Sequence, residues 1–241
     1  MFHRANRRRE FFHIKSAMAN LSYLEKILAL TILLLPLVSL KEAQFKCHKS
    51  MDMVILLDSS GSITRKQFIL EKKFASDLIK HFEISKEKTN VALAAFSQYT
   101  RTTRTFQNDV SEELVSKAIG ELRYEGAASR LDLGFDVVKF SLFNTENGAR
   151  VTNKGVKRVA VFLTDGYSTR GVEFTRDNAA ALHDKLGVQL FSVGISGRVN
   201  KAELDELASK PRKTHQLFMH FPTKPFSKEQ VEHFAKQICK A

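Results

Sequence analysis

The segment Val54-Ile55-Leu56-Leu57-Asp58-Ser59-Ser60-Gly61-Ser62 decides the fold prediction for this chain. An apolar run ends there in one carboxylate and two hydroxyls at alternate positions, Asp58, Ser60 and Ser62. A short apolar run that is bounded by turn-forming residues is typical of a buried parallel strand. In open α/β sheets, ligands bind at the carboxyl ends of the strands, and oxygen donors suit a hard cation such as Mg²⁺. The segment therefore predicts a strand that ends in part of a cation site.

Two later segments could complete the same site. The apolar run Val159–Leu163 ends in Thr164, Asp165 and Gly166, and the small-residue loop Tyr124–Ser129 precedes an amphipathic helix. If the two apolar strands are neighbours in a parallel sheet, Asp58 and Asp165 meet at one edge. Ser129 would then bring a further hydroxyl from the third loop.

The chain resembles a von Willebrand factor type A domain over roughly residues 50–240, in particular those of extracellular matrilins and type VI collagen. In that family, a D-x-S-x-S segment, a loop threonine and a T-D-G aspartate form a metal-ion-dependent adhesion site. The resemblance implies that Mg²⁺ or Mn²⁺ is held here and that an acidic residue of a protein partner completes its coordination. The implied metal ligands are Asp58, Ser60, Ser62, Ser129 and Asp165.

One loop departs from the family pattern. The usual G-G-x-T-x-T sequence is replaced by Gly126-Ala127-Ala128-Ser129-Arg130-Leu131, in which serine keeps the hydroxyl. A structural matrix scaffold with an idle metal site therefore remains an alternative to an adhesion module.

Apolar strand patterns alternate with helical patterns along the chain. Beyond the first strand we expect strands over residues 90–96, 101–106, 157–164, 188–195 and 216–221, with 101–106 at an edge. Helices are expected after Thr64, over 111–119, after Ser129, over 174–186 and 201–208, and around 231–238. This alternation predicts an α/β fold with a doubly wound, mainly parallel central sheet that is covered by helices on both faces.

The amino-terminal sequence has the pattern of a secretory signal peptide. Four arginines precede the apolar run Ile27–Leu40, which is shorter than the about 20 residues of a membrane-spanning helix. We expect a signal peptide over 1–40, a short segment over 41–50 and one domain over 51–241. The expected protein is secreted and lacks a stable membrane span, unless the leader is retained as a signal anchor.

The two cysteines flank the predicted domain. Two cysteines in a secreted chain indicate one disulfide, between Cys47 and Cys239, with two free thiols as the alternative. The resemblance favours the disulfide, because several extracellular members of the family tie their termini in this way.

The formal net charge is +12, and about +8 remains without the first forty residues. This excess favours acidic partners such as sulfated glycans, although it could serve solubility alone. Expected secretion, and the lack of a basic stripe interleaved with aromatic residues, argue against nucleic acid. The expected partner is an extracellular protein such as collagen or another matrix glycoprotein.

Several residues of the expected loops could select the partner, although each could equally be ordinary solvated surface. These candidates are Gln98, Tyr99, Tyr124, Arg130, Tyr167 and Ser168, with Arg101 and Arg170 nearby.

An enzyme is not expected. A Mg²⁺-dependent hydrolase with an aspartyl nucleophile would need a second acid two residues after Asp58, where Ser60 stands. The sequence also lacks the G-x-S-x-G, P-loop and G-x-G-x-x-G motifs.

Overall fold

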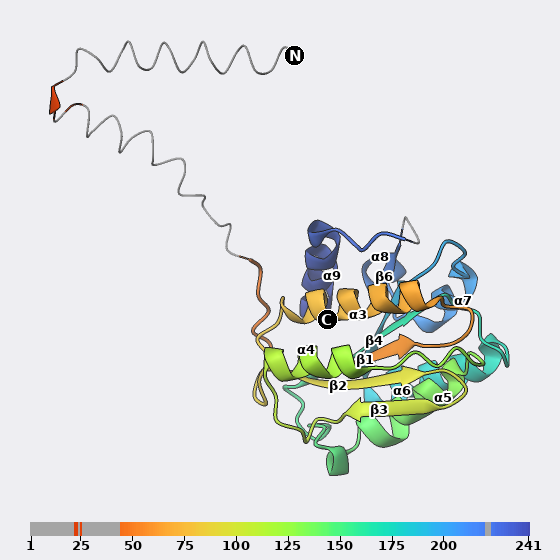
Figure 1. Ribbon diagram of the computed structural model, residues 1–241. Coiled ribbons are helices and arrows are strands. Elements are labelled where there is room, and N and C mark those ends of the chain that lie inside the picture. Colours follow the sequence, from red (N-terminus) through yellow and green to blue (C-terminus); the bar gives the residue numbers. More distant parts are fainter. Residues whose placement is uncertain (1–21, 24, 26–43, 220–222) are drawn as a thin grey trace, which may run out of the picture. The chain divides into compact units, whose positions relative to one another are not determined.

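The computed structural model describes residues 22–23, 25, 44–219 and 223–241 (Figure 1). The chain divides into two compact units, Met1–Gln44 and Phe45–Ala241, and the second holds the folded domain. The predicted signal peptide lies almost wholly outside the described residues. Within the described part, no helix is both long and apolar enough to cross a membrane.

The domain is built on one six-stranded sheet with the order β3-β2-β1-β4-β5-β6. Every pairing is parallel except that of β2 with β3, and β3 lies at an edge of the sheet, as predicted. The strands are β1 Met51–Asp58, β2 Thr89–Phe96, β3 Thr100–Arg104, β4 Lys157–Thr164, β5 Val188–Gly194 and β6 Gln216–Phe218.

Helices cover both faces of the sheet, which confirms the doubly wound α/β prediction (Figure 1). Successive residues of β1 point to opposite faces, so Ile55 and Leu57 pack in one core and Val54 and Leu56 in the other. The first core is closed by α3 Arg65–Ile79, α4 Glu112–Glu121 and α9 Lys228–Lys240. The second is closed by α5 Leu131–Val137, α6 Val172–Leu186 and α7 Lys201–Leu207.

Two helix ends carry the expected local signals. Thr64 and Gln67 form a capping box at the start of α3, where each side chain accepts the other's backbone N–H. Gly187 ends α6 in the left-handed conformation, with a φ of 62°, and its N–H donates to the carbonyl of His183.

Several element boundaries differ from the prediction. β1 begins three residues before the apolar run, because the polar Asp52 is buried within it. The edge strand ends at Arg104, where the N–H of Thr105 donates to Asn108 and turns the chain. β6 ends at Phe218, so the expected strand over 216–221 is too long, and residues 220–222 lie outside the described part.

The helix expected after Ser129 changes type along its length, and two further short helical segments were not predicted. α5 runs into a π-helix, Val138–Leu142, which is closed by a hydrogen bond from Phe143 N–H to the carbonyl of Val138. A 3₁₀ turn, Thr145–Asn147, and the four-residue α8, Arg212–His215, lie in stretches without apolar periodicity.

Cys47 and Cys239 form a disulfide with a Cα–Cα distance of 5.9 Å, so the alternative of two free thiols is wrong. The bond ties the segment before β1 to α9 and encloses a loop of 192 residues. Chain-entropy arguments give such a cross-link about 5 kcal/mol of stabilisation. It therefore holds the two ends of the domain together.

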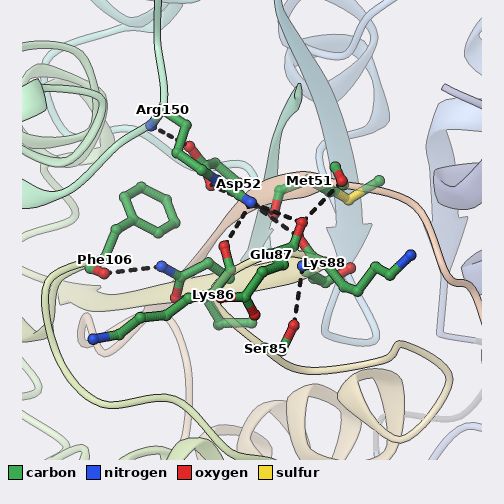
Figure 2. Close-up of polar contacts among 12 residues, drawn as sticks. Met51, Asp52, Ser85, Lys86, Glu87, Lys88, Phe106 and Arg150 are labelled. Atoms are coloured by element: carbon green, nitrogen blue, oxygen red, sulfur yellow. Dashed lines mark hydrogen bonds and ion pairs between the residues drawn. The ribbon is translucent and has the colours of Figure 1, made fainter. Parts of the chain in front are cut away.

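A buried ion pair joins the amino ends of the strands (Figure 2). The Oδ1 atom of the fully buried Asp52 accepts from Nε of Arg150 at 2.8 Å, and Oδ2 accepts from the Arg150 backbone N–H at 2.6 Å. The same guanidinium donates to the carbonyls of Met51, Lys86, Glu87 and Lys88. One side chain from the loop before β4 thus connects β1 with the segment before β2.

Candidate metal site

The loop after β1 supplies the first group of candidate ligands. Asp58 is the last residue of β1 and is fully buried. Its Oδ1 accepts from the N–H of Ser60 at 2.8 Å, and its Oδ2 accepts from the hydroxyl of Thr164 at 2.7 Å. The hydroxyls of Ser60 and Ser62 lie 3.0 Å apart. Neutral donors from β1 and β4 thus fix the Asp58 carboxyl and bring two hydroxyls beside it.

The loop after β4 supplies the second carboxyl. β1 and β4 are parallel neighbours, so Asp165 lies at the same edge of the sheet as Asp58. The Asp165 carboxyl accepts from the Tyr167 N–H at 3.2 Å, and the Ser62 hydroxyl lies near enough to act against the rise of the Asp165 pKa. Ser62 of the first loop therefore lies beside the second loop.

The loop before α5 brings Ser129 against the other two. The Ser129 N–H donates to the hydroxyl of Thr169 at 2.9 Å, and the Thr169 N–H returns to the Ser129 carbonyl at 2.9 Å. Gly61 donates to the carbonyl of Ala127 at 2.7 Å, and a Cβ on Gly61 would lie 3.1 Å from the Gly126 carbonyl oxygen. These close backbone contacts favour glycine at position 61 and link the first loop to the loop before α5.

The hydroxyl of Ser129 is buried, yet it has no hydrogen-bond partner among the described residues. Such a group costs about 1–3 kcal/mol unless a solvent molecule or an ion satisfies it. This unsatisfied oxygen belongs to the loop whose sequence departs from the family pattern. The serine that replaces the usual threonine thus has a hydroxyl oxygen that is free to coordinate a cation.

Burial raises the pKa of Asp58 to about 7, although Ser60 and Thr164 donate to its carboxyl, and the nearby charge of Asp165 adds to the rise. Burial likewise raises the pKa of Asp165. In the described part of the chain, neither carboxyl has a Lys, Arg or His within ion-pair distance. The site therefore has negative groups without a cation of its own.

A third buried carboxyl, which the sequence analysis missed, lies beneath the site. Oε2 of Glu71 on α3 accepts from the Asp58 N–H at 3.0 Å, and Oε1 has no partner among the described atoms. Burial raises the pKa of Glu71 well above its usual value, and the charge of Asp58 adds to the rise. The available signal was an acid on the helix face that carries Phe68 and Ala75.

The chemistry of this donor set fits a hard divalent cation. Two carboxyls and three hydroxyls offer only oxygen, which suits Mg²⁺ or Mn²⁺ and disfavours softer metals. Across the residues described, no cluster of three or more His, Cys, Asp or Glu is arranged to hold a metal. The candidate ligand set contains three hydroxyls and only two carboxyls, so it does not form such a cluster. A bound cation would satisfy the Ser129 hydroxyl oxygen and the unpaired carboxyls of Asp58 and Asp165.

The six candidate partner-contacting residues fall into two groups. Gln98, Tyr99 and Tyr167 are exposed, the two tyrosines by 61% and 51%. The other three have their polar groups bonded within the domain: the Tyr124 hydroxyl donates to the Ile63 carbonyl, Arg130 donates to Asp132, and the Ser168 hydroxyl donates to Glu203. The exposed group is therefore better placed to meet a partner.

Comparison with known proteins gives the chain a family. Cochlin from Cavia porcellus is 31% identical over 172 residues, which are 71% of this chain and 30% of cochlin. Matrilin-1 from Gallus gallus is 28% identical over 169 residues, or 70% of this chain and 33% of matrilin-1. The chain therefore spans about a third of the length of these relatives.

Solved structures agree on the fold. Proximal thread matrix protein 1 from the mussel byssus has a TM-score of 0.71 at 21% identity, over 80% of this chain and 49% of that one. A structure of the same protein with a zinc-occupied MIDAS (metal-ion-dependent adhesion site) motif gives 0.70. Manganese-loaded TRAP protein from Plasmodium vivax gives 0.65 at 17% identity, over 80% of this chain and 74% of that one. The family model for the von Willebrand factor type A domain matches residues 52–229, and this chain belongs to that family.

Proposed function

We propose that this chain is a secreted binding module that recognises an acidic residue of an extracellular matrix protein through a bound divalent cation. The proposed cation ligands are Asp58, Ser60, Ser62, Ser129 and Asp165. The observation that carries the proposal is the convergence of two buried, unpaired carboxyls with the unsatisfied Ser129 hydroxyl. Similarity to matrilin-1 and to a matrix protein with a metal-occupied site supports it.

The chemistry of recognition follows from the charges of the ligands. When bound, Mg²⁺ or Mn²⁺ supplies an electrophilic centre that accepts a further oxygen. Asp58 and Asp165 together balance a doubly charged ion, and the three serines add neutral oxygens. A partner carboxylate can then bind with no bond broken, so the proposed role is adhesion and not catalysis.

The proposed setting is extracellular. A disulfide between Cys47 and Cys239 is stable in oxidising compartments, and residues 1–40 have the sequence pattern of a signal peptide. Collagen or another matrix glycoprotein is the proposed class of partner, with anionic glycans as additional ligands of the basic surface.

The test is capture from extracellular matrix extract on the immobilised, disulfide-bonded domain in MgCl₂ and in EDTA. We expect retained matrix proteins in MgCl₂, their loss in EDTA, and their loss in Asp58→Ala. The matched control is Asp109→Ala, whose side chain is 91% exposed, and it should capture as the native domain does.

Capture that persists in EDTA would instead support a scaffold with an idle metal site. Hydrolysis of simple phosphate esters that disappears in Asp58→Ala would support an enzyme. Either result would overturn the proposal.

A further inference from the structure

A cleft of about 600 Å³ opens beside the candidate metal site. Ser62 and Asp165 line one part of it, and Tyr167 and Arg198 line another. Ligand pockets in proteins typically have volumes of about 300–1,000 Å³. The cleft can therefore hold side chains of a partner next to the position where a bound cation would meet that partner.

The loop between β5 and α7, which carries Arg198, is fixed against the metal-site loops. The N–H of Asn200 donates to the carbonyl of Asp165 at 2.8 Å. The N–H of Arg198 donates to the hydroxyl of Ser196 at 3.0 Å. Gly166 approaches this loop so closely that a Cβ there would lie 2.9 Å from the Asn200 carbonyl oxygen. The backbone of Arg198 therefore keeps a set position relative to Asp165.

Arg198 differs from four other arginines in the loops at this edge of the sheet. Arg130 donates two hydrogen bonds to Asp132, at 2.8 and 2.7 Å, and Arg101 lies 3.9 Å from Glu125. Two more guanidinium groups lie over aromatic rings, that of Arg65 on Tyr124 and that of Arg170 on Phe174. The Arg198 side chain is exposed and, within the residues described, forms no ion pair, side-chain hydrogen bond or ring contact.

We infer that the partner presents two anionic groups, and that Arg198 binds the second while the first meets the cation. This inference rests on the proposed function. A guanidinium binds a carboxylate through two parallel hydrogen bonds, which gives strength and a fixed orientation. Arg198 would thus select among acidic sequences that a cation alone cannot distinguish.

An acidic protein segment fits this cleft better than a sulfated glycan. A polysulfated chain is bound by a row of available cations, whereas Arg198 is the one lysine or arginine among the described residues that line this cleft. The exposed ring of Tyr167 offers an apolar surface for the peptide between its two acids.

The test is an NMR titration of the ¹⁵N-labelled, disulfide-bonded domain in MgCl₂ with two synthetic Gly/Ser peptides. One peptide carries two Asp residues separated by two positions, and in the other the second Asp is Asn. We expect the two-Asp peptide to bind about tenfold more tightly, because its second carboxylate adds charge-assisted hydrogen bonds to the Arg198 guanidinium. Arg198→Gln should remove that advantage and leave the affinity for the one-Asp peptide unchanged.

Arg176→Gln is the matched control, because it removes an exposed charge on α6 that pairs with Glu206, and it should keep the advantage. Equal affinities for the two peptides in the native domain, or an advantage that survives in Arg198→Gln, would overturn the inference. A heparin oligosaccharide that binds more tightly than the two-Asp peptide and is lost in Arg198→Gln would assign the cleft to a sulfated glycan and overturn the peptide assignment.

Calorimetry with MgCl₂ separates this inference from the proposal beneath it. Magnesium uptake together with equal peptide affinities would contradict the role of Arg198 alone. No magnesium uptake would contradict the metal site and, with it, this inference.

Discussion

An aspartate is completely buried at each end of β1, but only one of the two is paired with a cationic side chain. At the amino end, Asp52 is paired with Arg150, whose guanidinium also binds four backbone carbonyls (Figure 2). At the carboxyl end, Asp58 has only neutral donors, and its pKa is raised to about 7. The chain itself supplies the counter-charge of Asp52, whereas in the proposed function a bound cation supplies that of Asp58.

The largest loss of stability should come from removing the Asp52–Arg150 ion pair at the amino end of β1. Arg150→Ala leaves the Asp52 charge and several carbonyls unpaired, and should lower the free energy of unfolding by about 3–5 kcal/mol in urea denaturation. Arg176→Ala removes only an exposed pair and should change it by less than about 1 kcal/mol. A loss in Arg150→Ala no larger than in this control would contradict the contrast between the two ends.

The second largest effect should be the pH dependence that Asp58, at the carboxyl end of β1, gives to the free energy of unfolding. The folded pKa of Asp58 lies above its unfolded value of 3.8, so the folded state binds more protons between them. In chelator, the free energy of unfolding should therefore be highest near pH 4 and fall by about 2–4 kcal/mol as the pH rises through 7. Asp58→Asn should make the free energy of unfolding less dependent on pH.

In MgCl₂ a bound cation would replace the proton on Asp58, so magnesium affinity should rise over the same pH range. Magnesium affinity that is independent of pH would argue against Asp58 as a ligand.

A smaller effect is expected at the buried acid beneath the site. Glu71→Gln keeps an oxygen to accept from the Asp58 N–H but removes an ionisable group whose pKa is raised. Metal-free protein should gain about 1–2 kcal/mol in free energy of unfolding at pH 8, and little at pH 5. Glu121→Gln on α4 is the exposed control. An equal gain at both pH values would show that ionisation of Glu71 is not the cause.

The smallest change in stability should come from Ser129→Ala. Its buried hydroxyl makes no hydrogen bond, so its removal relieves an unsatisfied group and leaves a small cavity. The free energy of unfolding of metal-free protein should therefore rise by no more than about 1 kcal/mol, while magnesium affinity falls about tenfold. Ser97→Ala is the matched control, because its hydroxyl bonds to Ala127 N–H and the Ala128 carbonyl; it should cost about 1–2 kcal/mol. Unchanged magnesium affinity in Ser129→Ala would remove the serine from the proposed ligand set.

The local sequence predicts the parts of the molecule that depend on local pattern. The apolar runs of β1 and β4 predicted these two strands, and their terminal aspartates predicted that Asp58 and Asp165 follow neighbouring strand ends. The capping box at Thr64 and the left-handed Gly187 followed from short motifs.

The parts that depend on long-range contact were not predictable in this way. Arg150 lies between the predicted helix after Ser129 and the predicted strand over 157–164, and its partner Asp52 is 98 residues away. Glu71 sits on an apolar helix face that gives no sign of the Asp58 amide above it. Tyr124, Arg130 and Ser168 were predicted at the partner surface, and only their three-dimensional neighbours reveal that their polar groups are already bonded.

The most direct test is calorimetric titration of MgCl₂ into the chelator-treated, disulfide-bonded domain at pH 7.5. We expect saturable uptake by the native protein, its loss in Asp58→Ala, and its retention in Asp109→Ala. No magnesium uptake by the native protein, or unchanged uptake in Asp58→Ala, would contradict the proposal that Asp58 at the carboxyl end of β1 binds a divalent cation.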